Sequence, residues 1–468
     1  MKRGTKLLIL LAVLAVVGLG AWLAARYTAQ LEAEEESAGV AVLSIDTETV
    51  TALGWTHDGE TVSLACADGQ WSYADSDACP IDQSYPQTMV DTLAEVLAQE
   101  TIAEPEDLAS YGLDDPQCTV TLTADGTDYE LLIGDETVLG GQLYLSTGDG
   151  SVYLVDTSLL DAFAYGLYDI IQMEEIPAMD DVSALTIDGE TRTMEIRCQE
   201  DSGLAYSDDY VWFLAEGGDW LALDTDLTES LVETVTGLTW QSCVSYDASE
   251  EDLASYGLDT PAVTAAVTYT VTEEDEDGES QSRTETFTLE IGDYSGESCY
   301  ARIAGSGMVY LIDAAVSDSL LYTAYDDLRP DEVLAMDWDT VTSIDVAVDG
   351  QTYTVTREVS TVTDEEGEES QEVAYLLDGA EVEFQDLLDD LNAMASTGSA
   401  VGLTPERSAQ ISFTFHRNTE TFPQVELVFY QYDSSNCLVS LDGEVVLLAA
   451  REDVEAVVEA AAALIPEA

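Results

Sequence analysis

One stretch of the sequence occurs twice: Glu106-Asp107-Leu108-Ala109-Ser110-Tyr111-Gly112-Leu113-Asp114 returns unchanged 145 positions later as Glu251 to Asp259. A proline follows each copy within two residues. An identical repeat at this spacing indicates a module copied along the chain. Because glycine allows a positive φ and aspartate can cap a turn before proline, we interpret the motif as a structural corner, with a ligand site as the alternative.

Two β-hairpins are predicted after each copy of this nonapeptide. Apolar and polar residues alternate in 118–123 and 129–133, and again in 263–271 and 287–291. The return strands end in Ile133-Gly134-Asp135 and Ile291-Gly292-Asp293. The second hairpins run from Tyr144 to 152–156 and from Tyr300 to 309–313, and short helices are expected at 159–168 and 316–325. Alternation of this kind is typical of strands with one buried face.

A second shared segment lies upstream and occurs three times, beginning at Val50, Val182 and Val341. Each copy leads to an expected strand turn, at Asp58-Gly59, Asp188-Gly189 and Asp349-Gly350. Three starts predict three modules, at 48–177, 178–335 and 336–468. Apolar residues at helical spacing predict one amphipathic helix in each: Met89, Leu93, Val96 and Leu97; Leu231, Val235 and Leu238; Phe384, Leu388, Leu391 and Met394.

The third module is a degenerate copy. Gly402-Leu403-Thr404-Pro405 stands where the corner motif should be, followed by apolar residues at 411–415, weak strands at 438–440 and 445–448, and a terminal helix at 452–464. The fold class is therefore expected to be α+β: an N-terminal transmembrane helix, then tandem modules of antiparallel β-hairpins with short packing helices.

The N-terminus has the pattern of a membrane anchor. Residues 7–25 form an uncharged, largely apolar run, with three cations before it and Arg26 after it. A helix of this length spans roughly 28 Å, close to the thickness of a bilayer core. The charge bias places residues 1–6 in the cytoplasm and everything after a linker at 26–47 outside. A cleaved signal peptide is the alternative, although no clean cleavage site follows the run.

The chain is strongly acidic. Beyond Arg26 it holds nine arginines, no lysine and all 95 acidic residues, so this part carries a formal charge of −86. Such a polyanion repels nucleic acid and anionic lipid headgroups. A hydrophobic content of 46% nevertheless indicates folded domains. Diffuse divalent-cation binding is possible, but the acidic inserts at 273–279 and 364–369 lack the ligand spacing of an EF-hand and are interpreted as solvated hairpin tips.

The seven cysteines do not form a recognisable metal or redox motif, because no two of them have C-x-x-C spacing. They are Cys66, Cys79, Cys118, Cys198, Cys243, Cys299 and Cys437. Cys66 and Cys79 are close enough in sequence to form a disulfide in an oxidising compartment. The odd count favours buried free thiols.

Residues for common catalytic mechanisms are scarce, and no catalytic, cofactor or metal residue is assigned. His57 and His416 are the only histidines, and no lysine follows residue 6. A Ser-His-Asp or Cys-His site would therefore depend on a single histidine. Pairs of carboxylates remain open as a hydrolase site, since acidic residues are so abundant. Five tryptophans could form a carbohydrate-stacking surface, although core packing is favoured: Trp71, Trp212, Trp220, Trp240 and Trp338.

These motifs resemble a known family. Leu108-x-x-Tyr111-Gly112-Leu113-Asp114-x-Pro116, the Ile-Gly-Asp turn and the strand 152–156, all repeated in the second module, are similar to the family called domain of unknown function 4340. The resemblance extends from Val50 to about Leu464, and Thr404 departs from it. It implies a bacterial, membrane-anchored, extracytoplasmic protein, frequently encoded beside ABC-type permeases and gliding-associated transporter components. It implies no catalytic residues.

The function expected from these features is that of a non-enzymatic, single-pass cell-membrane protein with its C-terminal part extracytoplasmic. It would serve as an accessory or scaffold component of an ABC-transporter-like assembly, with a permease or another envelope protein as partner. A cell-surface binding protein for wall glycan or divalent cations is the alternative. A carboxylate-based hydrolase is a weaker alternative.

Overall fold

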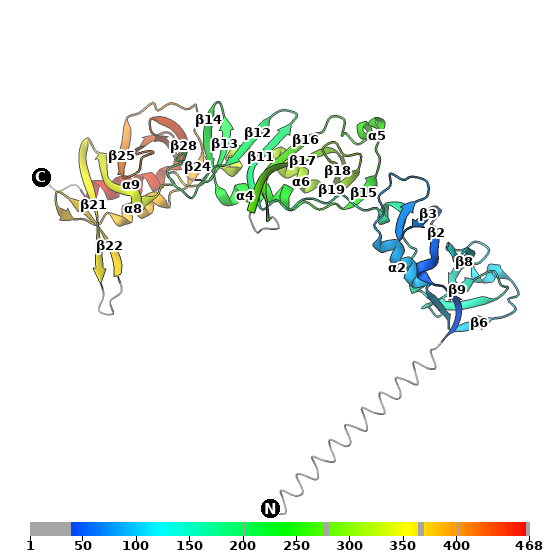
Figure 1. Ribbon diagram of the computed structural model, residues 1–468. Coiled ribbons are helices and arrows are strands. Elements are labelled where there is room, and N and C mark those ends of the chain that lie inside the picture. Colours follow the sequence, from blue (N-terminus) through cyan, green and yellow to red (C-terminus); the bar gives the residue numbers. More distant parts are fainter. Residues whose placement is uncertain (1–38, 201, 275–279, 364–368, 401, 465–468) are drawn as a thin grey trace, which may run out of the picture. The chain divides into compact units, whose positions relative to one another are not determined.

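The computed structural model describes residues 39–200, 202–274, 280–363, 369–400 and 402–464. These residues form three large antiparallel sheets, one two-stranded sheet and short helices, which confirms the α+β class (Figure 1). The chain packs into two compact units. The first contains residues 39–175 together with Trp240–Ser249 and Gly307–Leu311, and the second contains Ile176–Thr239, Glu250–Ser306 and the chain from Ile312 onward.

The first large sheet has eight strands in the order β4-β3-β2-β7-β8-β9-β10-β6. Their bounds are β2 Val50–His57, β3 Glu60–Ala67, β4 Gln70–Tyr73, β6 Glu100–Ile102, β7 Cys118–Ala124, β8 Thr127–Glu136, β9 Gln142–Ser146 and β10 Val152–Asp156. Strands β1 (Val40–Ser44) and β5 (Glu95–Ala98) form the small sheet. The helical segments are η1 Thr47–Thr49, α2 Ser84–Leu93, η2 Leu108–Tyr111, α3 Ser158–Asp161 and η3 Leu167–Ile170.

The second large sheet has nine strands in the order β14-β13-β12-β11-β16-β17-β18-β19-β15. Their bounds are β11 Asp181–Gly189, β12 Thr193–Cys198, β13 Trp212–Glu216, β14 Asp219–Leu223, β15 Ser242–Ser245, β16 Val263–Glu274, β17 Ser280–Ser295, β18 Ser298–Ile303 and β19 Val309–Asp313. The helices are α4 Thr225–Thr236, α5 Glu250–Ser255, α6 Ala314–Tyr322 and α7 Tyr325–Leu328.

The third large sheet has nine strands in the order β23-β22-β21-β20-β25-β26-β27-β28-β24. Their bounds are β20 Val341–Val348, β21 Gln351–Thr363, β22 Glu369–Leu377, β23 Ala380–Glu381, β24 Ser396–Ser399, β25 Ala409–Arg417, β26 Gln424–Gln431, β27 Asn436–Leu441 and β28 Glu444–Ala450. The helical segments are η4 Trp338–Thr340, α8 Gln385–Asn392 and α9 Arg451–Ala463.

The three sheets share one topology, which confirms that the chain is built of repeated β modules. In each, the first strand (β2, β11 or β20) lies in the middle of the sheet and pairs with the strand that opens the later meander (β7, β16 or β25). A helix follows the first hairpins, and a strand after it, β6, β15 or β24, lies at the far edge of the sheet. In the first module β5 lies between α2 and β6 and pairs with β1 in the small sheet. The degenerate third copy keeps this order although it has lost the corner motif.

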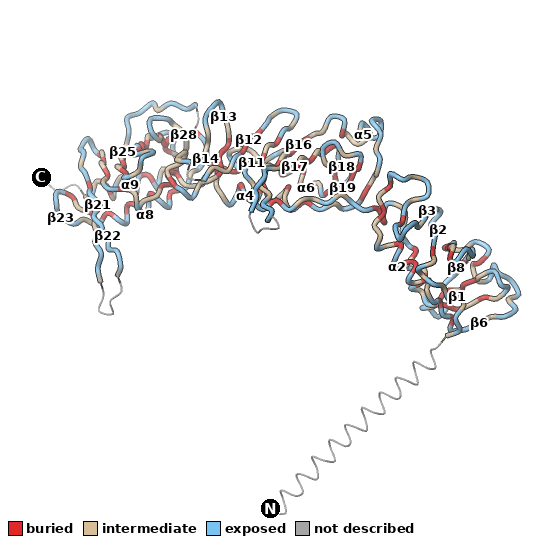
Figure 2. The backbone as a smooth tube through the Cα atoms, in the orientation of Figure 1, coloured by how far each residue is buried: buried red, intermediate tan, exposed pale blue. Residues whose placement is uncertain are grey.

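Buried residues alternate with more exposed ones along the longer strands β7, β16, β20 and β25, as the sequence predicted. In the third sheet Ile344, Val346 and Val348 of β20 are buried, and Leu388 of α8 and Val457 of α9 belong to the same core cluster. Helices therefore cover one face of this sheet (Figure 2). Threonines and charged residues cover much of the opposite face, which accounts for the alternating pattern.

Three expectations for individual elements are wrong. Helix α2 ends at Leu93, and Val96 and Leu97 lie in β5, because β5 pairs with β1 and this pairing replaces the helical hydrogen bonds. Asp188 and Gly189 are the last residues of β11, so that turn lies at 190–192. The helix expected at 159–168 is divided into the short segments α3 and η3.

The expected transmembrane helix at 7–25 lies outside the described residues. Within 39–464, apart from the short gaps in the description, no helix is long and apolar enough to span a bilayer. The acidic inserts also lie mostly outside the description, at 275–279 and 364–368. Each connects the two strands of a hairpin, since Glu274 pairs with Ser280 and Thr363 pairs with Glu369.

Candidate functional site

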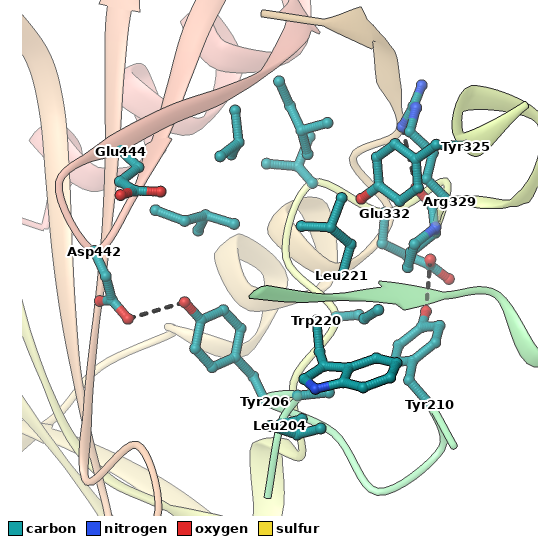
Figure 3. A pocket seen from close by; sticks show the side chains of 18 of the residues that line it. Leu204, Tyr206, Tyr210, Trp220, Leu221, Tyr325, Arg329, Glu332, Asp442 and Glu444 are labelled. Atoms are coloured by element: carbon teal, nitrogen blue, oxygen red, sulfur yellow. Dashed lines mark hydrogen bonds between the residues drawn. The ribbon is translucent and has the colours of Figure 1, made fainter. Parts of the chain in front are cut away.

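The second unit contains a cavity of about 540 Å³, a size within the range of small-molecule sites. Its walls come from the loop between β12 and β13, strand β14, the chain around α7, and the β25–β26 and β27–β28 turns (Figure 3). Five aromatic rings line it: Tyr206, Tyr210, Trp220, Tyr325 and Phe422. Such a concave, mainly apolar surface with a few polar groups is typical of ligand pockets.

Tyr206 is fixed by the anchoring of its own loop. The next two residues bind the carboxylate of Asp337: the Ser207 hydroxyl donates at 2.6 Å and the Asp208 amide at 3.1 Å. The Tyr206 hydroxyl donates to Asp442 Oδ2 at 2.9 Å, and its ring meets Phe422 edge-on at 4.8 Å. Burial, followed by the bond to Asp442, raises the pKa of Tyr206. This ring is therefore held before any ligand arrives.

Tyr210 and Glu332 form the second fixed pair in the wall. The Tyr210 hydroxyl donates to Glu332 Oε2 at 2.9 Å (Figure 3). Burial and the neighbouring carboxylate raise the pKa of Tyr210, so the phenol remains a donor and Glu332 the acceptor. A third carboxylate, Glu444, is exposed at the first position of β28.

Trp220 lies on β14, the edge strand of the second sheet. The guanidinium of Arg197 on β12 is placed over its ring, 5.3 Å from the centroid. No further strand lies beside β14, and the Trp220 ring lines the cavity.

Arg329 is the only cation among the residues that line this cavity, and its side chain is 10% exposed. Its Nη1 donates to the Pro330 carbonyl at 3.1 Å, whereas its buried Nε has no hydrogen-bond partner in the described structure. Asp326 Oδ1 lies 3.6 Å from Nε and supplies a counter-charge. Tyr325, one helical turn earlier, has its pKa raised by burial. One arginine against three carboxylates leaves the lining with a formal charge of −2.

The two histidines occupy unrelated sites. His57 lies 3.2 Å from the Gln117 carbonyl, and His416 Nε2 lies 2.9 Å from Asp345 Oδ2. Hydrogen bonds from His416 and Thr354 lower the pKa of Asp345. Among the described residues neither imidazole is hydrogen-bonded to a serine, threonine or cysteine side chain, so the geometry offers no activated nucleophile there.

The five candidate tryptophans have different environments. Trp71 and Trp212 are buried, and Trp240 stacks on Tyr310 at 4.2 Å. Trp338 donates to Asn392 Oδ1 at 2.8 Å. Of the five, Trp220 alone lines the cavity. Its partners there are tyrosines and a phenylalanine that the sequence did not single out.

The nonapeptide forms a tight corner in both copies. Gly112 and Gly257 have φ values of 68° and 69°, as a left-handed turn requires. The corner packs on the Ile-Gly-Asp turn: a Cβ added to Gly134 would lie 2.1 Å from the Tyr111 carbonyl oxygen, and one added to Gly292 would lie 2.2 Å from that of Tyr256. Both family motifs are thus the two halves of one backbone contact.

The remaining candidates are the thiols and the acidic clusters. All seven cysteines are free, and five are buried. In the part of the chain that is described, no three His, Cys, Asp or Glu side chains converge as metal ligands. A second hollow of about 520 Å³ lies over the first sheet, where small residues such as Ala52 and Gly54 line it together with Asp128 and Glu130.

The site residues that the sequence analysis missed belong mainly to irregular segments. Tyr206 and Tyr210 lie in a loop, and their partner Asp442 is 236 positions from Tyr206. The sequence did contain one signal for this site, because two tyrosines occur in a loop of otherwise mainly small and polar residues. Aromatic residues in such loops often mark binding surfaces.

Fold and cavity together define a tandem-repeat α+β protein with a small-molecule-sized pocket. Its sequence matches the profile of the domain of unknown function (DUF4340) over residues 71–210 and 212–410. The chain belongs to this family, as the corner motifs indicated. No curated protein matches it.

Proposed function

We propose that this chain is a non-enzymatic, extracytoplasmic binding protein, held at the cell membrane by residues 7–25, that takes a small ligand into the cavity beside β14. The observation that carries the proposal is the preformed pocket, in which Tyr206 and Tyr210 are already fixed by Asp442 and Glu332. Preorganised side chains reduce the entropy lost on binding. The surroundings of His57 and His416 support a role without catalysis.

The test is ligand binding by the full chain in detergent micelles, followed by tryptophan fluorescence and thermal unfolding. The probes are phenethylamine, 2-phenylethanol, 3-phenylpropionate, a disaccharide of N-acetylglucosamine, and calcium. Ala222→Phe fills the cavity from β14, whereas Ala409→Phe adds the same ring at an exposed position. We expect at least one organic probe to bind, and Ala222→Phe alone to abolish its binding. Binding of no probe, or equal binding by both variants, would refute the pocket as the site.

A second candidate function is that of a scaffold in an ABC-transporter-like assembly, which the family resemblance suggests. The hairpin β21–β22 supports it, because Val359, Val362 and Val373 are 46%, 38% and 41% exposed near its end (Figure 2). Val359 and Val373 pair across the two strands. Exposed aliphatic residues grouped on one hairpin are typical of protein contacts.

This second function predicts that replacing both paired valines by threonine removes a membrane partner. The measurement is co-purification of the full chain from solubilised membranes, with an ABC permease as the expected partner. Replacing Thr354 by serine in the body of the same strand is the matched control. If no membrane protein co-purifies with the unmodified chain, the scaffold function is wrong, while the cavity is unaffected.

A further inference from the structure

We propose that the cavity is selective for a small organic cation, an amine or quaternary ammonium group on an apolar body. This inference rests on the proposed binding function and adds the chemical class of the ligand. Three features of the cavity wall support this ligand class: the aromatic rings, the excess of carboxylates and the aliphatic side chains.

Aromatic rings are the first feature. Five of them converge on a cavity that would hold a single small molecule. The face of an aromatic ring attracts a cation, and it does so more strongly when the pair is desolvated. Trp220 already holds a cation in this way, since Arg197 lies over its ring.

The carboxylates provide the charge. Tyr206 donates to Asp442 and Tyr210 donates to Glu332, so each of these two carboxylates is held in the wall by a phenol. Asp442 also accepts the Glu426 amide at 2.7 Å. The Glu444 side chain is exposed and makes no hydrogen bond or ion pair within the described residues, which leaves both of its carboxylate oxygens free for an ammonium group.

Arg329 does not reverse this preference. Asp326 stands 3.6 Å from its Nε, and its Nη1 is bound to the Pro330 carbonyl. An anionic ligand would have to approach this compensated cation in the presence of Glu332, Asp442 and Glu444. Like charges repel more strongly in a partly desolvated cavity than in bulk water. The wall therefore disfavours a carboxylate or phosphate.

The aliphatic remainder of the wall disfavours a saccharide. Nine of the lining residues are alanine, valine or leucine: Leu204, Ala205, Leu221, Ala222, Val333, Ala335, Leu441, Val446 and Leu447. A sugar places a hydroxyl on nearly every carbon, and each one buried against this surface without a partner is costly. An alkyl or aryl body fits the same surface.

The charge of the whole chain acts in the same direction. A formal charge of −82 produces a negative field that concentrates cations near the surface and accelerates their association. This contribution is long-ranged and screened by salt, whereas the contacts inside the cavity are screened much less.

The experiment compares three probes of one shape and different charge in calorimetric titrations of the full chain. These are phenethylamine, 2-phenylethanol and 3-phenylpropionate, with tetraethylammonium as a quaternary probe. We expect the amine to bind about tenfold or more tightly than the alcohol, and the carboxylate to bind least. Glu444→Gln should weaken amine binding by about threefold to tenfold without changing the affinity for the alcohol. Glu358→Gln removes an equal charge outside the wall and should leave amine affinity nearly unchanged.

Equal or tighter binding of the alcohol or the carboxylate would overturn the cation preference and leave the binding function standing. The same conclusion would follow if only the disaccharide bound. Failure of every probe to bind would overturn the binding function itself. Glutamine preserves an acceptor oxygen and the side-chain shape of glutamate, so both glutamine variants are expected to fold, and unchanged thermal unfolding would verify this.

Discussion

At the scale of single residues, Gly134 lies so close to the backbone of Tyr111 that it has no room for a side chain. Its missing side chain lets β8 pass beneath the corner, because a Cβ there would lie 2.1 Å from the Tyr111 oxygen. We expect Gly134→Ala to lower the free energy of unfolding by about 3 kcal/mol, since the backbone must move to relieve the overlap. Urea unfolding of the full chain measures this change. It is monitored by tryptophan fluorescence, to which Trp55 and Trp71 of the first module contribute.

The matched control for this substitution is Gly126→Asn. Gly126 has a positive φ, of 70°, which Gly134 does not, but nothing lies within 4 Å of its added Cβ, and asparagine tolerates this conformation. Its cost should stay below about 1 kcal/mol. Equal destabilisation by both variants would mean that the close approach to Tyr111 does not account for the cost of Gly134→Ala.

Thiol reactivity gives a second prediction at this scale. Burial raises the pKa of Cys118 to about 12 and that of Cys79 to about 11, which suppresses the reactive thiolate. In the native chain near pH 8 we expect iodoacetamide to modify Cys66 and Cys198, the two half-buried thiols, well before the other five. Peptide mapping by mass spectrometry shows the order. Modification of Cys118 at its denatured rate, or a Cys66–Cys79 disulfide in a non-reducing map, would contradict these assignments.

At the scale of elements, the loop between β12 and β13 is held against the third sheet by a buried polar cluster. Asp337 accepts from the loop through Ser207 and Asp208, and Arg417 Nη2 lies 3.9 Å from the same carboxylate. The Arg417 side chain is 4% exposed and its Nε donates to Thr340 at 2.8 Å. Burial lowers the pKa of Arg417, although Asp337 opposes this shift. The cluster therefore fixes the loop that carries Tyr206.

We expect Arg417→Ala to destabilise the second unit by about 2–3 kcal/mol, because the buried Arg417 side chain loses its packing and the half-buried Asp337 carboxylate loses its nearby cation. It should also weaken binding in the cavity, since the Tyr206 loop loses its anchor. Thermal unfolding and a phenethylamine titration measure the two effects. Arg451→Ala, which breaks only the exposed pair with Glu455, should cost less than about 0.5 kcal/mol. A small effect of Arg417→Ala would show that the cluster does not hold the loop.

Sequence patterns predicted the elements whose pairing is local and missed those that depend on distant partners. Alternation located β7, β8, β16 and β17 because each hairpin buries one face. It failed for β5, where pairing with β1, about 50 positions earlier, replaced a helical continuation. The cavity was missed for the same reason. Tyr206 lies in a loop without periodicity, and only the folded chain brings it to Asp442.

At the scale of the whole molecule, the dominant feature is the formal charge of −82, which the few arginines cannot balance. Repulsion among exposed carboxylates opposes the compact state and is screened when the Debye length falls to about 3 Å near 1 M salt. We expect the melting temperature to rise by about 5–10 °C between roughly 10 mM and 500 mM NaCl, as about 2–3 kcal/mol of repulsion is removed. Differential scanning calorimetry of the full chain measures the shift.

At pH near 4.5, where ordinary carboxyl groups begin to be protonated, the gain in melting temperature from salt should shrink because less charge remains to be screened. A gain that is unchanged at this pH, or that keeps growing linearly above about 1 M, would assign the effect to salting-out of apolar surface instead of charge repulsion.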